Sequence, residues 1–243
     1  MTGPVRARRR VPRGLAVALV VALAALAAGT VAAYHVVRST TQETPPAHHQ
    51  DRNEEQTPTP GCAWATVFDG YGSATCVGST VTLSPAPATD ASQTHAGLAT
   101  SRTVTIPEGD TTVISATVTT RSQLRTGDAP NPWEVAWLLW SFQDPDHFYA
   151  LVLKPNGWEV SKQDPDSAGA QQFLASGTEP TFAVGTAHNV TLTVSTIGEQ
   201  MTVDIAVDGE PLVSVTDTAE PYLQGAVAAY CEDAVVDVSL TPN

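Results

Sequence analysis

Four residues in the middle of the chain combine types and spacing that could do chemistry: Trp133, Trp137, Lys154 and Glu159. The flat, apolar faces of the indole rings could stack on sugar rings, and the ammonium and carboxylate groups could hydrogen-bond to hydroxyl groups at the ring edges. The competing interpretation is that both tryptophans fill a second core layer, because large aromatic side chains are usually mostly buried. The choice depends on the strands that carry these residues.

Three predicted strands position the four residues. The segment 133–142 is apolar at almost every position, which is typical of a central strand covered on both sides. A turn at 143–146 separates it from a second strand at 147–154. Asn156-Gly157 is a strong hairpin signal, because a type I′ turn needs positive φ at both central positions. The segment 158–162 is therefore a third strand that folds back on the second.

The expected register brings aromatic rings and charges to one face. With a two-residue loop at 156–157, Lys154 lies opposite Glu159 as a pair of opposite charges. The turn at 143–146 places Trp137 beside Val152. A slip of one residue would exchange the two faces. The opposite face is expected to be core and holds Ala136, Leu138, Trp140, Tyr149, Leu151, Leu153 and Val160.

The N-terminus has the pattern of an export segment. Residues 1–13 are basic, and 14–34 are apolar, with twenty uncharged residues that would span about 30 Å as a helix. Two alternatives stay open: a single-pass membrane anchor, or a signal peptide cleaved after the small residues 31–33 to give a secreted protein. Because the basic side stays in the cytoplasm, we expect the rest outside the cell membrane. Residues 35–60, rich in Pro, Thr and Glu, are expected to be a flexible linker.

The charge balance excludes one class of partner. The chain has 25 Asp and Glu residues against 12 Lys and Arg residues, and five of the 12 precede residue 14. The exported part of the chain is strongly acidic, which argues against the binding of nucleic acid and against the binding of anionic polymers by electrostatics alone. It favours neutral or cationic partners, or a divalent metal.

Strand signals follow one another at short spacing from residue 63 onward. The segments 112–120, 190–194 and 203–207 alternate polar and apolar residues, and Asp208-Gly209 is a second hairpin signal. About a dozen short strands, without a long amphipathic helix, predict that 61–243 is one all-β domain, a two-sheet sandwich.

Six segments carry a family resemblance: VFDGYG at 67–72, NPWEVAWLLW at 131–140, DHFYALVLKPNGWEVSK at 146–162, QQFLASG at 171–177, TVDIAVDGEPLVSVTD at 202–217 and PYLQGAVAAYCEDAVVDVSL at 221–240. With them the chain resembles the concanavalin A-like lectin/glucanase superfamily. More narrowly, it is similar to bacterial laminin-G-like domains and to 3-keto-disaccharide hydrolase-like domains assigned to glycoside hydrolase family 16. The resemblance implies a curved jelly-roll β-sandwich whose concave sheet binds glycans in many members.

Catalytic members of this superfamily resemble one another in a Glu-x-Asp-x-Glu strand, which supplies nucleophile and general acid on one face. No such run occurs here: the Trp-rich strand has only Glu134, and the adjacent Glu232 and Asp233 point to opposite faces of a strand. We therefore expect no catalytic residue, and a membrane-anchored, extracytoplasmic carbohydrate-binding module. Two alternatives stay open. One is a glycan-cleaving hydrolase or lyase that uses Glu134 or Glu159 with His147, and the other is an envelope scaffold that binds another protein.

The resemblance also implies a structural calcium ion where the first and last strands meet. The matching acidic positions are Asp69 and Asp237, which backbone carbonyls and water would complement to six to eight oxygen ligands. The alternative is that Asp69 only forms an Asp-Gly turn.

Three cysteines in an exported domain allow one internal disulfide and leave one thiol. A bond from Cys62 to Cys76 would close a loop of about 15 residues, worth roughly 3 kcal/mol. The alternative is a bond to Cys231, because the first and last strands are neighbours in similar sandwiches.

Overall fold

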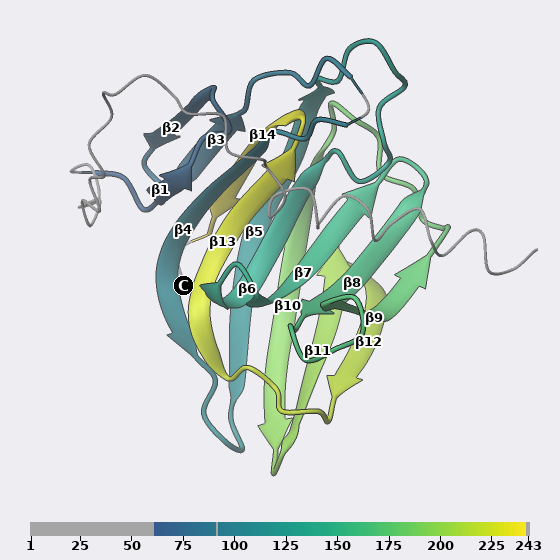
Figure 1. Ribbon diagram of the computed structural model, residues 1–243. Helices are drawn as coiled ribbons and strands as arrows, with labels where there is room; N and C mark the ends of the chain where they lie inside the picture. Colours follow the sequence, from purple (N-terminus) through teal and green to yellow (C-terminus); the bar gives the residue numbers. More distant parts are fainter. Residues whose placement is uncertain (1–60, 91, 242–243) are drawn as a thin grey trace, which may run out of the picture. The chain divides into compact units, whose positions relative to one another are not determined.

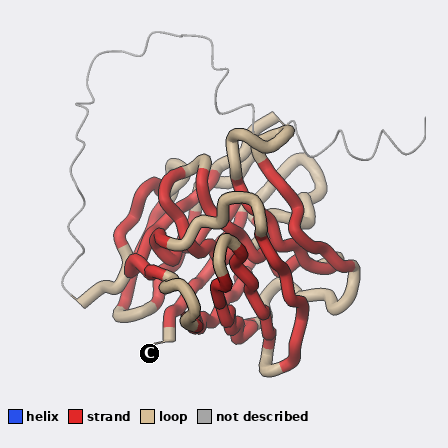
Figure 2. Tube along the Cα trace, turned by 90° about the horizontal axis from the view of Figure 1, so that it is seen from below, coloured by secondary structure: helices blue, strands red, loops and turns tan. Residues whose placement is uncertain are grey.

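The computed structural model describes residues 61–90 and 92–241, which form a two-layer β-sandwich (Figure 1). Figure 2 shows this part of the chain as strands joined by loops. The predicted basic N-terminus, the anchor or signal segment and the linker lie outside the described residues. Within the described residues, no helix has the length and apolar character needed to cross a membrane.

Each layer is a seven-stranded sheet in which all neighbouring strands are antiparallel. In spatial order, sheet 1 contains β1 (Ala65–Phe68), β4 (Ala96–Thr105), β13 (Gln224–Glu232), β6 (Ala136–Asp144), β7 (His147–Lys154), β8 (Gly157–Gln163) and β9 (Gln171–Gly177). Sheet 2 contains β12 (Glu210–Asp217), β11 (Gln200–Val207), β10 (Ala187–Ile197), β5 (Thr111–Gln123), β14 (Ala234–Leu240), β3 (Thr80–Ser84) and β2 (Ser73–Val77). The predicted all-β, two-sheet architecture is confirmed.

The main core lies between the sheets and follows the alternation of the strands. Trp140 and Tyr149 are fully buried there, with ring centroids 5.3 Å apart in a stacked arrangement. The seven residues expected on the core face of 136–160 all belong to this core: Ala136, Leu138, Trp140, Tyr149, Leu151, Leu153 and Val160. Trp137 pairs with Val152 as predicted. The assignment of inner and outer faces is therefore confirmed.

The β7–β8 hairpin corrects one predicted turn. Lys154 pairs with Gly157, so the loop residues are Pro155 and Asn156 rather than Asn156 and Gly157. Proline has no backbone N–H to pair in the ladder, and its φ near −65° suits the first central position of a type I turn, so the turn includes Pro155 and lies one residue toward the N-terminus. Gly157 is needed for another reason: a Cβ there would lie 2.0 Å from the carbonyl oxygen of Gly177. The shift of the turn changes the partner of each β7 residue on β8 by two positions, so every side chain stays on the face that was predicted for it.

The second hairpin signal behaves as predicted. Asp208 and Gly209 both have positive φ and connect β11 to β12, with Val207 paired to Glu210. No proline precedes this turn, so the type I′ requirement is met directly.

The disulfide joins Cys62 and Cys76, and Cys231 is a buried free thiol. Burial raises the pKa of the Cys231 thiol to about 12. Of the pairings that the sequence left open, the local one is therefore present, and it anchors the start of the sandwich to β2.

Candidate functional site

One continuous row of side chains crosses sheet 1 on the face that points away from the core. Each member pairs with the next across a strand boundary, and the row consists of Phe68, Leu98, Tyr230, Trp137, Val152, Glu159 and Ser176. We call it the Trp137 row. It unites aromatic residues from β1, β13 and β6 with a charged residue from β8, so the strand order of sheet 1 determines its composition.

A second row runs beside the first and carries mostly small side chains, such as Ala228, Ala150 and Ser161. Beyond it lie Phe142 and Phe148, whose ring centroids are 5.9 Å apart. Ala228 and Ala150 are fully buried, because the larger side chains on both sides close over them. The outer face is therefore an aromatic platform with its own hydrophobic cluster beneath.

Trp137 is the central ring of this platform. Its side chain is half-buried and meets Tyr230 edge to face, with centroids 5.2 Å apart. Its Nε1 donates a hydrogen bond to the carbonyl oxygen of Trp133 at 2.8 Å. The indole N–H is thus used internally, and only the apolar surface of the ring is offered to a ligand. The predicted second core layer is present in part, since Trp137 covers it without being fully buried.

Lys154 and Glu159 form an ion pair at the margin of the platform. Glu159 pairs directly with Val152, so the contact with Lys154 is diagonal rather than directly opposite. Their side chains are 11% and 24% exposed, which leaves polar atoms within reach of a ligand. The structure brings Trp137, Lys154 and Glu159 onto one face, while Trp133 contributes its backbone carbonyl from the turn before β6.

Glu232 is a residue of this face that the sequence prediction missed. It lies two positions after Tyr230 on β13, and its Oε1 accepts a hydrogen bond from the Tyr230 hydroxyl at 2.7 Å. Burial raises the pKa of the Glu232 carboxyl, and the charges of Asp233 and Glu134 act in the same direction, while the hydrogen bond from Tyr230 and the charge of Arg125 offset part of the rise. The signal was present in the alternation of Ala228, Tyr230 and Glu232, but β13 had no predicted neighbour.

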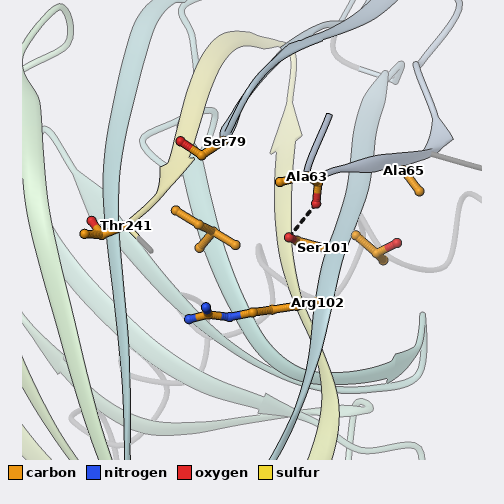
Figure 3. Close-up of a pocket in the computed structure, with 8 residues that line it drawn as sticks. Ala63, Ala65, Ser79, Ser101, Arg102 and Thr241 are labelled. Carbon is orange, nitrogen blue, oxygen red and sulfur yellow. Dashed lines mark hydrogen bonds between the residues drawn. The ribbon is translucent and has the colours of Figure 1, made fainter. Parts of the chain in front are cut away.

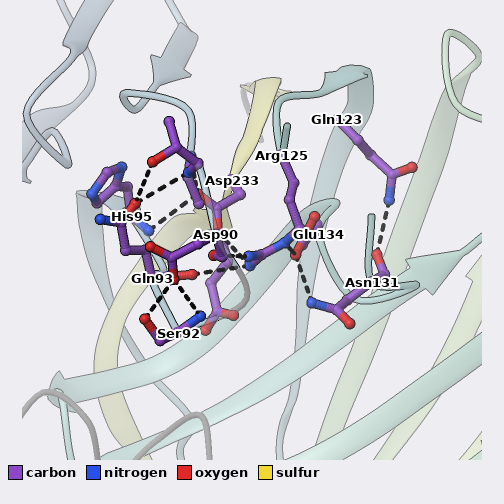
Figure 4. Close-up of polar contacts among 12 residues, drawn as sticks. Asp90, Ser92, Gln93, His95, Gln123, Arg125, Asn131, Glu134 and Asp233 are labelled. Atoms are coloured by element: carbon purple, nitrogen blue, oxygen red, sulfur yellow. Dashed lines mark hydrogen bonds and ion pairs between the residues drawn. The ribbon is translucent and has the colours of Figure 1, made fainter. Parts of the chain in front are cut away.

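The carboxylate of Glu134 lies inside the sandwich, not on the platform. Figure 4 shows it facing the guanidinium of Arg125, whose Nε donates to Glu134 Oε1 at 2.6 Å. Arg125 also donates to Asp233 Oδ2 at 2.9 Å, and all three side chains are at most 3% exposed. Asn131 also donates to Glu134 Oε1, whereas Oε2 is buried without a hydrogen-bond partner among the described residues. This cluster ties the loop after β5 to sheet 1, and the Glu134 carboxylate is buried away from the platform.

His147 has no carboxylate of the platform beside it. Its Nδ1 lies 2.8 Å from Asp144 Oδ1 in the β6–β7 turn, and its ring packs edge to face on Tyr222. Glu159 pairs with Val152, five residues along β7 from His147, which is about 16 Å of strand. The structure therefore does not bring together the residues expected for a hydrolase or lyase.

Asp69 and Asp237 have separate partners. Asp69 Oδ1 accepts from the backbone N–H of Tyr71 in the turn after β1, while Asp237 accepts from Thr82 at 2.6 Å and pairs with Arg121 at 2.5 Å. Calcium takes six to eight oxygen ligands, and a carboxylate already paired with a guanidinium is a poor member of such a set. In the described residues no group of three or more His, Cys, Asp or Glu side chains could hold a metal. As arranged, these two residues do not fit the ion.

A cleft of about 480 Å³ opens elsewhere, near the C-terminal end of β14 (Figure 3). Ser101 and Arg102 of β4 line it together with Ala63 and Thr241, and Ser101 Oγ donates to the carbonyl oxygen of Ala63 at 2.6 Å. No residue of the Trp137 row lines this cleft, so it is separate from the platform.

No protein-family model matches the chain, and no curated protein matches it. Among solved structures, the exoplasmic/lumenal domain of VIP36 in its Ca²⁺/Man3GlcNAc-bound form is similar, with 15% identity, 74% of this chain and 83% of that chain covered, and a TM-score of 0.45. Lectin I-B4 from Griffonia simplicifolia in its metal-free form has 11% identity, covers 74% and 91%, and has a TM-score of 0.43. Sheep galectin-11 in complex with glycerol has 12% identity, covers 58% and 95%, and has a TM-score of 0.37. The likeness concerns the two-sheet architecture and identifies no residue of the site, and the assignment to laminin-G-like or glycoside hydrolase 16 domains stays a prediction.

Proposed function

We propose that the chain binds glycans on the aromatic platform of sheet 1 and does not cleave them. One observation carries the proposal: half-buried Trp137 and Tyr230 adjoin each other in a row that continues to Glu159, which is paired with Lys154. Ring faces suit the apolar side of a sugar, and a charged pair at the margin supplies a donor and an acceptor for hydroxyl groups. The inner rings Trp140 and Tyr149, by contrast, are fully buried.

The spacing of carboxylates supports binding without hydrolysis. Glu159 and Glu232 are the acidic residues of β8 and β13 on the outer face, and β6 and β7 lie between those strands. Three strand spacings amount to about 14 Å, whereas glycosidases place their two carboxyl groups about 5–9.5 Å apart. Glu159 and Glu232 are therefore too far apart to act together as a retaining or inverting pair.

The proposal extends to the cell envelope. A single-pass anchor or signal segment at 14–34 and a linker at 35–60 would present the sandwich outside the membrane. The acidic composition agrees with neutral or cationic ligands. Calcium is not part of the proposed site, because neither Asp69 nor Asp237 lies in the Trp137 row.

The test uses the full-length chain in mild detergent on a panel of cell-wall and storage glycans, with retention and release of reducing ends measured together. We expect retention without products, and loss of retention in Trp137→Ala and Tyr230→Ala. Ile197→Ala, which changes an exposed apolar residue of sheet 2 at the end of β10, is the control and should bind normally. Product release would contradict the non-catalytic part. Absence of retention on every glycan, with co-purification of one protein, would favour an envelope scaffold instead.

A further inference from the structure

The cations of the sandwich are almost all engaged by carboxylates. Only five of the 12 Lys and Arg residues lie after residue 60, but 21 of the 25 Asp and Glu residues do. Four of these five cations have carboxylate partners in the described residues: Arg121 with Asp237, Arg125 with Glu134 and Asp233, Lys154 with Glu159, and Lys162 with Asp217. The one charge pair on the platform is thereby already balanced.

Glu232 is the exception on the platform. Among the described residues no Lys, Arg or His forms an ion pair with it, and its hydrogen bond from Tyr230 occupies Oε1 only. The second oxygen, Oε2, can accept a bond from a ligand. Its hydrogen bond from the Tyr230 hydroxyl places this carboxylate at the edge of the Trp137–Tyr230 ring pair, at the centre of the proposed site.

The surroundings of Glu232 make a cation the better partner. The side chain is partly buried, and behind it Glu134 and Asp233 share a single guanidinium, that of Arg125. Burial and these like charges disfavour the ionised carboxylate, and the hydrogen bond from Tyr230 and the charge of Arg125 offset only part of this, so the pKa of Glu232 is raised. An ammonium group would offset both effects, and a charge-assisted hydrogen bond is roughly twice as strong as a neutral one.

The neighbouring rings act in the same direction. A cation near the face of Trp or Tyr is attracted by the ring quadrupole, and the attraction increases where water is excluded. A sugar that stacks on Trp137 and carries an amine toward Glu232 would satisfy the carboxylate and both rings together. An N-acetylated amine is neutral and would not be attracted to the carboxylate in this way, and the carboxylate would repel an acidic sugar.

We infer that Glu232 makes the platform selective for glycans with protonated amino sugars over their N-acetylated and acidic counterparts. This inference rests on the proposed function, because the sugar ring is held by the same Trp137 surface. Glu232 is the specificity-determining residue, Trp137 holds the ring, and Tyr230 orients the carboxylate through its hydroxyl.

The experiment compares glucosamine oligomers with N-acetylglucosamine oligomers of equal length, titrated against the full-length chain by calorimetry at neutral pH and low salt. We expect the amino form to bind about tenfold tighter, which corresponds to about 1.4 kcal/mol. Glu232→Gln should bring the ratio close to one while the affinity for the acetylated form changes little. Glu210→Gln, an exposed carboxylate of β12 in sheet 2, is the matched control and should keep the ratio. Added salt should weaken the binding of the glucosamine oligomer only.

Three outcomes would overturn the inference. One is equal affinity of the wild-type chain for both oligomers. Another is an equal loss of affinity for both oligomers in Glu232→Gln, which would mean that the carboxylate only accepts hydrogen bonds from sugar hydroxyl groups. The third is binding of neutral glucans with no binding of either hexosamine oligomer, which leaves the proposed function standing. Absence of binding to every glycan would instead remove the proposed function itself. Unfolding curves of all variants exclude loss of the fold as the cause.

Discussion

Trp137 and Tyr230 meet edge to face with ring centroids 5.2 Å apart, although one belongs to β6 and the other to β13. The contact exists because β13 inserts between β4 and β6 in sheet 1. Since it lies on the outer face, the pair contributes a surface for a ligand while the inner face of the same strands supplies the core.

Two tryptophans of one strand should therefore respond differently to truncation. Trp137→Ala should lower the free energy of unfolding by about 1–2 kcal/mol, because a half-buried ring loses only part of its burial. Trp140→Ala should lower it by about 3–5 kcal/mol, since this ring is fully buried in the core. Urea unfolding measures both. Equal losses would mean that Trp137 is an ordinary core residue.

The buried ion pair between Lys162 and Asp217 should be far more important for stability than a surface pair. Lys162 Nζ lies 3.0 Å from Asp217 Oδ2, the side chains are 0% and 3% exposed, and Tyr149 also donates to that carboxylate at 2.5 Å. Lys162→Met should cost about 3–5 kcal/mol, because a buried carboxylate loses its cation. Arg121→Met is the control at an exposed pair and should cost about 0–1 kcal/mol. A similar loss in both variants would contradict this assignment.

Glu232 should make stability depend on pH. Its carboxyl has a folded-state pKa raised above the ordinary value of 4.5, so the native state holds the proton more tightly than the unfolded chain does. The free energy of unfolding should then fall as pH rises from about 4.5 through the folded-state pKa. Glu232→Gln removes this fall, so the variant should be more stable than the wild type at neutral pH and equal to it below 4.5. A stability difference independent of pH would show that the substitution acts through packing alone.

The cysteines should differ in their reactivity. Cys231 is buried and its thiol pKa is raised to about 12, so a thiol reagent should modify it only after unfolding. Cys62→Ser should lower the free energy of unfolding by roughly 3 kcal/mol, because the disulfide to Cys76 closes a loop of about 15 residues. Thiol titration of the native and the denatured chain gives the first result, and urea unfolding the second. Rapid labelling of native wild-type chain would contradict the burial.

Calcium should not be needed for stability or for glycan binding. Asp237 is already paired with Arg121, and Asp69 accepts a backbone N–H in its own turn. Chelation should leave the thermal midpoint and the glycan affinity unchanged. The opposite result would be a midpoint that rises with calcium concentration, as mass action requires of a bound ion, and that stops rising in Asp237→Asn.

Local patterns in the sequence determine which side chains of β6, β7 and β8 face the core. Alternation has a period of two, so Trp140, Tyr149 and Leu151 can be assigned to one face without knowledge of the neighbouring sheet. Composition and strand spacing likewise determine the all-β class. The same patterns indicated that Trp137, Lys154 and Glu159 share the other face.

Contacts between distant segments of the chain decided the strand order and, with it, which side chains form the candidate site. The sequence could not place Tyr230 and Glu232 beside Trp137, because strand order is set by non-local pairing and core packing. It could not show that Glu134 is buried, since the partner Arg125 comes from a loop after β5. The turn at Pro155 and Asn156 was likewise settled by the fixed φ of proline and the close approach of Gly157 to Gly177 on β9. The sequence by itself thus determined the faces of the strands, and the tertiary structure decided which faces became one surface, because only folding brings the strands side by side.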